Sequence, residues 1–326
     1  MKSTKQLVPL LTASVILFCS CGNPAKNNDA PANPSKALDI VKLEEVLGMK
    51  GVTKDGEFKI TVAQNDLHVV VDSFKIIPPM GLGSWAAFTS APEGAMVMGD
   101  IIVTETDLKP VEEEVIRQGL SVTAIHNHFV RDKPHVMYMH IGGMGTEEKL
   151  AEGVKGILEK VKKLRGMNPA EGSKESVKNT LDTAQLNNIL GCKGEMARGV
   201  FKHTFSRPDI NLKDHKTAVT SFLGFNTWAA WQGTPERAAV AGDFAMVESE
   251  VAPVIKALVE NGIEVVAVHN HMVHEEPRIF FLHYWGVGSA EKLVIGLKAA
   301  LDQTGKSRKN TVASIFPGFE EILCKN

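Results

Sequence analysis

The sequence has no excess of charge of either sign, few aromatic residues and no long apolar run. Its 36 Lys and Arg residues nearly balance 38 Asp and Glu residues, which gives a formal net charge of −2. Without a basic field, the chain is not expected to hold nucleic acid. Aromatic residues make up 6% of the chain, with only two tyrosines, so an aromatic platform for carbohydrate or nucleic acid is not favoured. No apolar run reaches the about 20 residues that a membrane-spanning helix needs.

Several signatures of familiar enzymes are also missing. The chain contains no Walker loop, no Gly-x-Ser-x-Gly nucleophile elbow, no CxxC pair and no His-Glu-x-x-His motif. We therefore expect no nucleotide cofactor. The 44% hydrophobic and 23% charged residues are typical of a globular protein, and 326 residues suggest two domains. In an exported protein Cys192 and Cys324 would form a disulfide, or both would remain thiols.

The first residues have the pattern of a secretory signal. Lys2 and Lys5 precede an apolar run of about 12 residues, which is the length of a signal h-region and too short for a membrane helix. The sequence Phe-Cys-Ser-Cys-Gly then resembles a bacterial lipobox, and Cys21 is the predicted lipidation site, although Phe18 replaces the usual leucine. Ordinary cleavage without a lipid is the alternative. We expect residues 1–20 to be a lipoprotein signal peptide.

The predicted cellular location follows from this signal and from the segment after it. Residues 21–37 are rich in Pro, Asn and Ala and lack a core-forming pattern, so we expect a flexible tether. The protein is then exported and lipid-anchored to the cell envelope, with its body in the periplasm or at the cell surface. The membrane is the expected partner, reached through the lipid.

The remainder of the chain repeats itself. LEEVLGMKG at 43–51 matches LNNILGCKG at 186–194, an offset of 186 − 43 = 143 residues. The same offset relates further pairs without insertion or deletion, among them Lys59 and Lys202, Trp85 and Trp228, Asp100 and Asp243, Glu105 and Glu248, and the two His-Asn-His segments at 126–128 and 269–271. Such self-similarity indicates a tandem duplication. We predict repeat domains at 38–165 and 184–326, joined by a polar linker at 166–183.

Each repeat predicts the same order of elements. The first repeat has helical spacing at 38–47, 107–118 and 146–163, strand patterns at 58–62, 68–71, 85–88 and 96–103, and a hairpin formed by 122–130 and 135–141. Strands, a helix, a His-bearing hairpin and a closing helix, repeated twice, favour an α+β fold of two pseudo-symmetric repeats with mainly antiparallel pairing.

The strongest motif is His-Asn-His followed after eleven residues by a third histidine. Positions i and i+2 of a strand share a face, and an odd hairpin loop brings the third imidazole to that face. Three imidazoles with a free fourth position suit zinc or another divalent metal. We predict a metal or ligand site in each repeat, formed by His126, His128 and His140 and by His269, His271 and His283. The alternative is that these histidines hydrogen-bond within a hairpin core.

Carboxylates and tryptophans complete the list of candidates. Asp100 and Asp243 follow a glycine in an apolar strand and are the candidate catalytic residues, as a general base or as a further metal ligand. The candidate ligand-binding residues are Trp85, Trp228, Glu105 and Glu248. The alternative for each glutamate is that it stands at the start of a helix, where the helix dipole favours an acidic residue. The alternative for each tryptophan is that it packs in the core.

The repeat and these motifs resemble the LppY/LpqO family of exported proteins and lipoproteins. The resemblance covers residues 40–315 and rests on GSWAAF at 83–88, Met98-Gly99-Asp100, and HNH at 126–128 with His140 and two glycines after it, plus their second-half partners. It implies a tandem domain without an established activity. The His-x-His motif alone is similar to the metal site of acetolactate decarboxylases, which implies hydrolase- or lyase-like chemistry.

Two functions remain open. A metal-dependent enzyme would use metal-bound water on a small substrate, helped by Asp100 or Asp243. A non-enzymatic lipoprotein would use the cleft between its two halves to hold a small-molecule or envelope ligand. Retention of all three histidines in both halves favours a function in each half, or one composite site.

Overall fold

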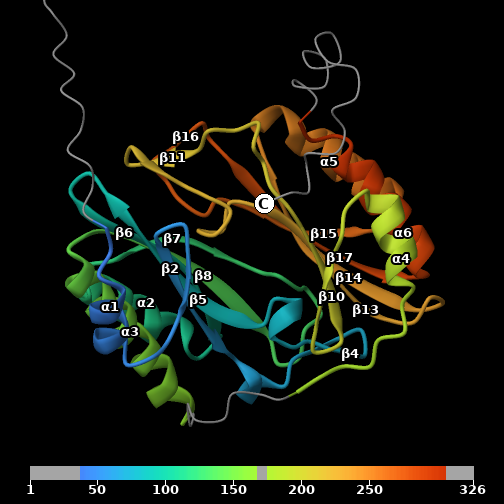
Figure 1. Ribbon diagram of the computed structural model, residues 1–326. Coiled ribbons are helices and arrows are strands. Elements are labelled where there is room, and N and C mark those ends of the chain that lie inside the picture. Colours follow the sequence, from blue (N-terminus) through green and yellow to red (C-terminus); the bar gives the residue numbers. More distant parts are fainter. Residues whose placement is uncertain (1–36, 167–174, 306–326) are drawn as a thin grey trace, which may run out of the picture. The chain divides into compact units, whose positions relative to one another are not determined.

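Two antiparallel sheets of six strands each form the centre of the protein (Figure 1). The computed structural model describes residues 37–166 and 175–305. The predicted signal peptide with Cys21, the tether up to residue 36, and Cys324 lie outside the described residues. The strand order is β1-β2-β5-β6-β8-β7 in one sheet and β15-β17-β14-β13-β10-β9 in the other. With six α-helices beside them, these sheets confirm the predicted α+β class.

The first repeat follows the predicted order closely. Its elements are α1 (Ile40–Leu47), β1 (Val52–Lys54), β2 (Glu57–Ala63), η1 (Asn65–Leu67), β3 (Val70–Val71), β4 (Phe74–Lys75), η2 (Pro78–Met80), β5 (Gly83–Ala91), β6 (Gly94–Thr104), α2 (Leu108–Arg117), β7 (Ser121–His126), β8 (Val136–Gly145) and α3 (Glu147–Arg165).

The second repeat contains the same three α-helices and the same eight strands at about the same offset; among its described residues there is no 3-10 helix, and the short strand β16 is additional. Its elements are α4 (Thr183–Leu190), β9 (Glu195–Ala197), β10 (Val200–Phe205), β11 (Lys213–Asp214), β12 (Thr217–Ala218), β13 (Thr227–Gly233), β14 (Ala238–Met246), α5 (Glu248–Glu260), β15 (Glu264–His269), β16 (Glu275–Glu276), β17 (Phe280–Gly288) and α6 (Ala290–Leu301). Equivalent strands occupy equivalent places in the two sheets, which confirms the prediction of two pseudo-symmetric repeats.

The helix ends follow ordinary capping chemistry. The Asp39 carboxylate accepts a hydrogen bond from the Lys42 N–H at the start of α1, and the Thr146 hydroxyl accepts one from the Lys149 N–H at the start of α3. Both helices end at a glycine in the left-handed region, Gly48 and Gly166. Side-chain caps and C-terminal glycines of this kind fix helix bounds locally, which is why the sequence predicts them well.

Side-chain alternation gives each sheet an outer and an inner face. The outer face of the first sheet, with Phe58 and Phe88, packs with residues of α1, α2 and α3 in one core cluster. The outer face of the second packs in the same way on α4, α5 and α6. The inner faces pack on each other, because buried clusters there mix residues of both repeats, such as Tyr138 with Ala241. The layers are therefore helices, sheet, sheet and helices (Figure 1).

Polar contacts also join the repeats. The Arg131 guanidinium donates hydrogen bonds to the Asp72 and Glu264 carboxylates, at 2.7–3.1 Å. The Trp285 indole N–H donates to Asp72 Oδ2 at 2.9 Å. The hydrogen bonds with Arg131 hold the pKa of Asp72 below its usual value. Asp72 in the first repeat is thereby tied directly to the second.

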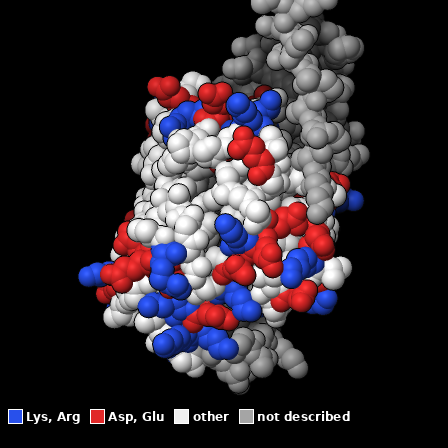
Figure 2. Space-filling view, turned by 90° about the vertical axis from the view of Figure 1, so that its left-hand side faces the viewer, with Lys and Arg blue, Asp and Glu red and all other residues white. Residues whose placement is uncertain are grey.

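The described helices and the face drawn in Figure 2 bear on membrane contact and charge. Among the described residues, no helix is both long and apolar enough to cross a bilayer. Figure 2 shows basic and acidic side chains interspersed over the face that it displays. This mixed surface agrees with the nearly neutral charge balance of the sequence.

Candidate metal centre

Strand register aligns the candidate residues in a row across each inner face. In the first sheet Trp85 pairs with Asp100, Asp100 with His140, and His140 with Ala124. His126 lies two positions after Ala124 and so shares its face. Paired positions here have an even sum, 124 + 140 = 126 + 138 = 264, as an odd hairpin loop requires. The prediction that the third histidine shares the face of the first is thus confirmed.

The second sheet presents the equivalent row. Trp228 pairs with Asp243, Asp243 with His283, and His283 with Ala267, two positions before His269. Because the inner faces pack on each other, the two rows meet between the sheets. We call the six imidazoles that meet there the histidine cluster: His126, His128, His140, His269, His271 and His283.

Contacts within the histidine cluster cross between the repeats. The His126 and His269 rings stack with centroids 3.8 Å apart. The His128 and His283 centroids are also 3.8 Å apart, and the equivalent pair, His140 and His271, lies at 4.0 Å. Within a repeat the centroids are farther apart, for example 4.8 Å between His126 and His140. Among the six imidazoles, the closest neighbour of each ring therefore comes from the other repeat, whereas Tyr138 and Phe281 of the same repeat stack on His128 and His271 at 3.3 Å.

The nitrogen atoms form three overlapping groups. In each group the potential ligand atoms all lie within 4.8 Å of one another, and the groups are His126-His269-His283, His140-His269-His271 and Asp100-His126-His140. Two of the groups take histidines from both repeats, which favours the composite site over the alternative of one separate site in each repeat. The sequence pattern describes one sheet only, whereas the site is made by the meeting of two.

The histidine cluster is buried and short of hydrogen-bond partners. His128 is 8% exposed and His140 is 3% exposed. Eight imidazole nitrogens of the cluster have no hydrogen-bond partner among the described residues, both of them in His126, His269 and His271 and one each in His128 and His140. Buried polar atoms are normally satisfied, so this concentration in one place points to a bound group.

Two imidazoles are oriented by the backbone. The Nδ1 atoms of His140 and His283 lie 3.2 and 3.0 Å from the carbonyl oxygens of Gly99 and Gly242, and each would donate to that oxygen in its Nδ1–H tautomer. This leaves the Nε2 atom of each ring free to bind a metal ion. Such a hydrogen bond on the far nitrogen is the usual support of a metal-bound histidine.

Burial keeps the imidazoles neutral. It lowers the pKa of His140 to about 4 and that of His283 to about 3. Burial, and then repulsion from the other imidazoles, lowers the pKa of His126 and His269 well below the usual value. Since neutral imidazole is the form that binds metal ions, the cluster is ready for one at pH 7.

The two predicted aspartates reach the cluster. Asp100 Oδ2 lies 3.7 Å from His128 Nε2, and Asp243 Oδ2 lies 3.5 Å from His271 Nε2. Burial raises the pKa of Asp100 to about 8 and that of Asp243 well above its usual value. A bound cation would oppose this effect by favouring the carboxylate. Each aspartate is therefore placed to ligate an ion or to exchange a proton beside it.

Two lysines belong to the same inner faces and were not among the candidates from the sequence. Lys59 Nζ lies 4.0 Å from the Trp85 ring centroid, and Lys202 Nζ lies 4.2 Å from that of Trp228. Burial lowers the pKa of both lysines to about 8. Only their occurrence at the same position in both repeats could have pointed to them as site residues, and a repeated lysine does not by itself indicate a binding site.

The predicted ligand-binding glutamates lie away from the histidine cluster, whereas the predicted tryptophans lie beside it. Glu105 and Glu248 are exposed and belong to none of the nitrogen and oxygen groups, and Glu248 lies in the first turn of α5, where the helix dipole favours it. Trp85 and Trp228 are partly buried beside the lysines. The structure thus brings the tryptophans to the site and leaves the glutamates outside.

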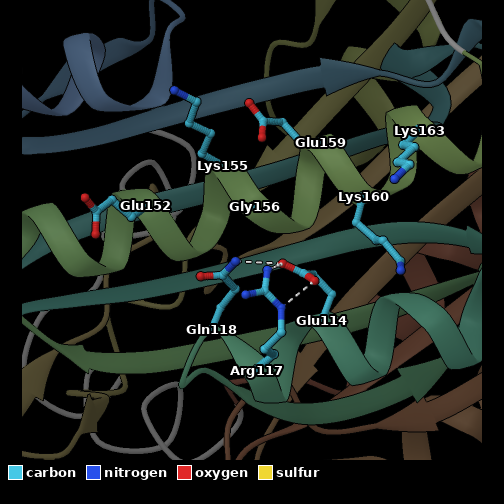
Figure 3. A pocket seen from close by; sticks show the side chains of 9 residues that line it. All are labelled: Glu114, Arg117, Gln118, Glu152, Lys155, Gly156, Glu159, Lys160 and Lys163. Carbon is cyan, nitrogen blue, oxygen red and sulfur yellow. Dashed lines mark hydrogen bonds and ion pairs between the residues drawn. The ribbon is translucent and has the colours of Figure 1, made fainter.

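A surface hollow between α2 and α3 does not compete with this site. It is lined by Glu114, Arg117, Gln118, Glu152, Lys155, Gly156, Glu159, Lys160 and Lys163. Figure 3 shows that Arg117 and Gln118 both donate hydrogen bonds to the Glu114 carboxylate. The Gln118 Nε2 to Glu114 Oε1 distance is 2.6 Å. At the offset of 143 residues the second repeat has Ala257 and Glu260 in place of Glu114 and Arg117, so the hollow is not shared by the repeats.

Comparisons with known proteins identify the duplicated domain. The chain matches a family described as Domain of Unknown Function (DUF1259) over residues 41–160 and again over residues 184–303. No curated protein matches the chain.

Three solved structures of microcompartment proteins show a faint similarity, each at 10% identity. They are the trimeric bacterial microcompartment shell protein PduB (TM-score 0.21, 80% of this chain and 93% of that chain), EtuB from Clostridium kluyveri (0.20, 81% and 93%) and the fused permuted hexameric shell protein MSM0275 from the RMM microcompartment (0.19, 75% and 94%). Such scores support no inference about this chain. The family match alone covers most of its length, and the chain belongs to the family described as Domain of Unknown Function (DUF1259), with one copy of the domain in each half.

Proposed function

We propose that the protein binds a divalent transition metal ion, of which zinc is the prime candidate, in the histidine cluster between its repeats. The observation that carries this proposal is the set of eight buried imidazole nitrogens without a hydrogen-bond partner among the described residues. Imidazole nitrogen suits zinc and its neighbours in the transition series, whereas magnesium and calcium prefer oxygen.

The proposed stoichiometry is one ion per chain. Any two of the three groups share one histidine: His269, His140 or His126. If each imidazole binds through one nitrogen, an ion in one group excludes an ion in the other two. The groups are then alternative positions for a single ion. Two of them take ligands from both repeats, and we propose that the ion occupies one of these two.

Metal-assisted catalysis is the second candidate function. It is favoured by the buried carboxyl groups of Asp100 and Asp243, 3.5–3.7 Å from imidazole nitrogens. A bound divalent ion supplies a Lewis acid and lowers the pKa of water that it binds. In a hydrolase- or lyase-like reaction, Asp100 or Asp243 would accept or return the proton at its carboxyl oxygen.

We also propose that the protein is an exported lipoprotein of the LppY/LpqO type. The support is the signal pattern before Cys21 together with the His-Asn-His and GSWAAF motifs in a tandem domain of unknown function. The envelope location and the lipid anchor rest on the sequence alone.

Metal analysis of the full-length chain, purified without a histidine tag, tests the central proposal. The expected result is about one zinc ion per chain after zinc loading and dialysis, and a loss of most of it in the variant His126→Ala/His269→Ala, which removes at least one ligand from each of the three groups. The double variant His68→Asn/His274→Ala changes two exposed histidines outside the cluster and should retain the ion. Equal metal content in all three proteins would refute the proposal.

A further inference from the structure

Lys59 and Lys202 carry two ammonium groups that form no ion pair with the described residues. Within the described residues, no carboxylate oxygen lies within 4.0 Å of either Nζ atom. The Lys59 ammonium donates to the carbonyl oxygen of Phe222 at 3.2 Å, and each ammonium lies over an indole ring. A half-buried lysine is usually paired, so two unpaired lysines at equivalent positions need an explanation.

The two lysines belong to the rows that lead to the histidine cluster. Thr61 pairs with Trp85, and Lys59 lies two positions before Thr61, so all three share the inner face of the first sheet. Thr204 pairs with Trp228 in the same way, which places Lys202 on the inner face of the second. The lysines are close enough that the charge of Lys202 lowers the pKa of Lys59, after the larger effect of burial.

Walls around these lysines are built from both repeats. A Cβ at Gly224 would lie 2.9 Å from the Trp85 ring, and a Cβ at Gly81 would lie 3.4 Å from the Trp228 ring and 3.3 Å from His128 Nδ1. Gly81 and Gly224 are equivalent and have φ angles of 107° and 102°. Gly81 of the first repeat therefore lies beside both the His128 imidazole and Trp228, the ring on which Lys202 rests.

We infer that a small oxyanion, of the carboxylate or phosphate type, binds between Lys59 and Lys202 and beside the metal ion. This inference rests on the proposed function, because the ion supplies the remaining positive charge. The positive charges of Lys59 and Lys202 balance the negative charges of Asp100 and Asp243 when both aspartates are ionised. The two positive charges of a bound divalent ion are then left without a counter-charge until an anion binds. Lysine ammonium groups and a metal ion are together a standard arrangement for holding oxyanions.

Calorimetric titration of the zinc-loaded full-length chain, with malonate or phosphate at constant ionic strength, tests this inference. Replacing one ammonium, as in Lys59→Met, should weaken binding about tenfold, and Lys59→Met/Lys202→Met on the order of 100-fold, because each change removes one charge-assisted contact. Methionine keeps the apolar stem over the indole. Lys54→Met, which changes an exposed lysine of β1, serves as the matched control and should bind as the parent does.

Zinc content, measured in the same samples, separates the two proposals. If the parent holds zinc and binds either anion, and the double variant holds zinc but loses the anion, the inference stands. The better of the two anions then identifies the type of oxyanion. If the parent holds zinc but binds neither anion, or if the double variant binds them as tightly, the inference is overturned while the metal proposal survives. A parent without zinc overturns the metal proposal itself.

Discussion

Acid should unfold the metal-free protein over a narrow pH range below about 6.5. Burial lowers the pKa of all six histidines of the cluster, so the folded protein keeps them neutral. The unfolded chain protonates them near pH 6.5. Below that pH the unfolded state therefore binds more protons, and the free energy of unfolding falls as the pH falls.

The two buried aspartates act in the opposite direction. Burial raises the pKa of Asp100 to about 8 and that of Asp243 well above its usual value, so the folded state holds their protons at pH values where the unfolded chain has lost them. Six additional protons in the unfolded state minus two in the folded state leave a net difference of about four near pH 5, and His203, whose pKa burial lowers to about 4, adds nearly one more. At about 1.4 kcal/mol per proton and pH unit, stability falls by about 5–7 kcal/mol per pH unit.

The free energy of unfolding of an ordinary domain is about 5–15 kcal/mol, so unfolding should be complete within about one to three pH units below 6.5. Urea titrations of the metal-free chain between pH 7.5 and pH 5, followed by circular dichroism, give the slope. The variant His140→Gln/His283→Gln removes two of the protonating groups and should reduce the slope by about half. A free energy of unfolding that stays constant from pH 7 to pH 5 would show that the imidazoles are not held neutral, and would refute this reasoning.

Three further predictions concern packing, the junction of the repeats and location. Gly242→Ala should destabilise the protein by about 2–4 kcal/mol in a denaturation assay, because the added Cβ would lie 2.1 Å from the Tyr284 hydroxyl. The control Gly142→Ala, whose Cβ would have its nearest neighbour at 3.6 Å, should change the free energy of unfolding by less than about 1 kcal/mol. Asp72→Asn should lower the free energy of unfolding by about 1 kcal/mol, and less at high salt, where the charge interaction with Arg131 is screened; no salt dependence would contradict it. Cys21→Ala should move the protein from the membrane fraction to the soluble fraction of a cell lysate, and continued membrane binding would disprove lipidation there.

Local patterns allowed most of the fold to be predicted. The helix bounds depend on caps such as Asp39 and Thr146, and the strands on alternation that is visible in the sequence. The sequence left the hairpin parity open, and the expectation of an odd loop, which places His140 on the face of His126, is confirmed by the register. The constant offset then predicted the same topology for the second half without further information.

The composition of the site could not be predicted in the same way. Whether His126 meets His140 or His269 depends on how two sheets pack, and that packing is determined by apolar residues distributed over the whole inner faces. Lys59 gave no signal of its own, because its importance comes from the indole beside it and the missing counter-ion. Tyr284 and Trp285, the aromatic residues next to His283, are buried in the core, and their burial likewise depends on packing that the sequence does not show.

Anomalous diffraction from crystals of the zinc-loaded protein would locate the ion and its ligands. We expect one strong peak per chain inside the histidine cluster, about 2.0–2.1 Å from imidazole nitrogens that belong to both repeats. His269 is the key ligand to inspect, because it belongs to both of the groups that span the repeats. A peak bonded by the histidines of one repeat alone, or no peak among these residues, would contradict the composite site.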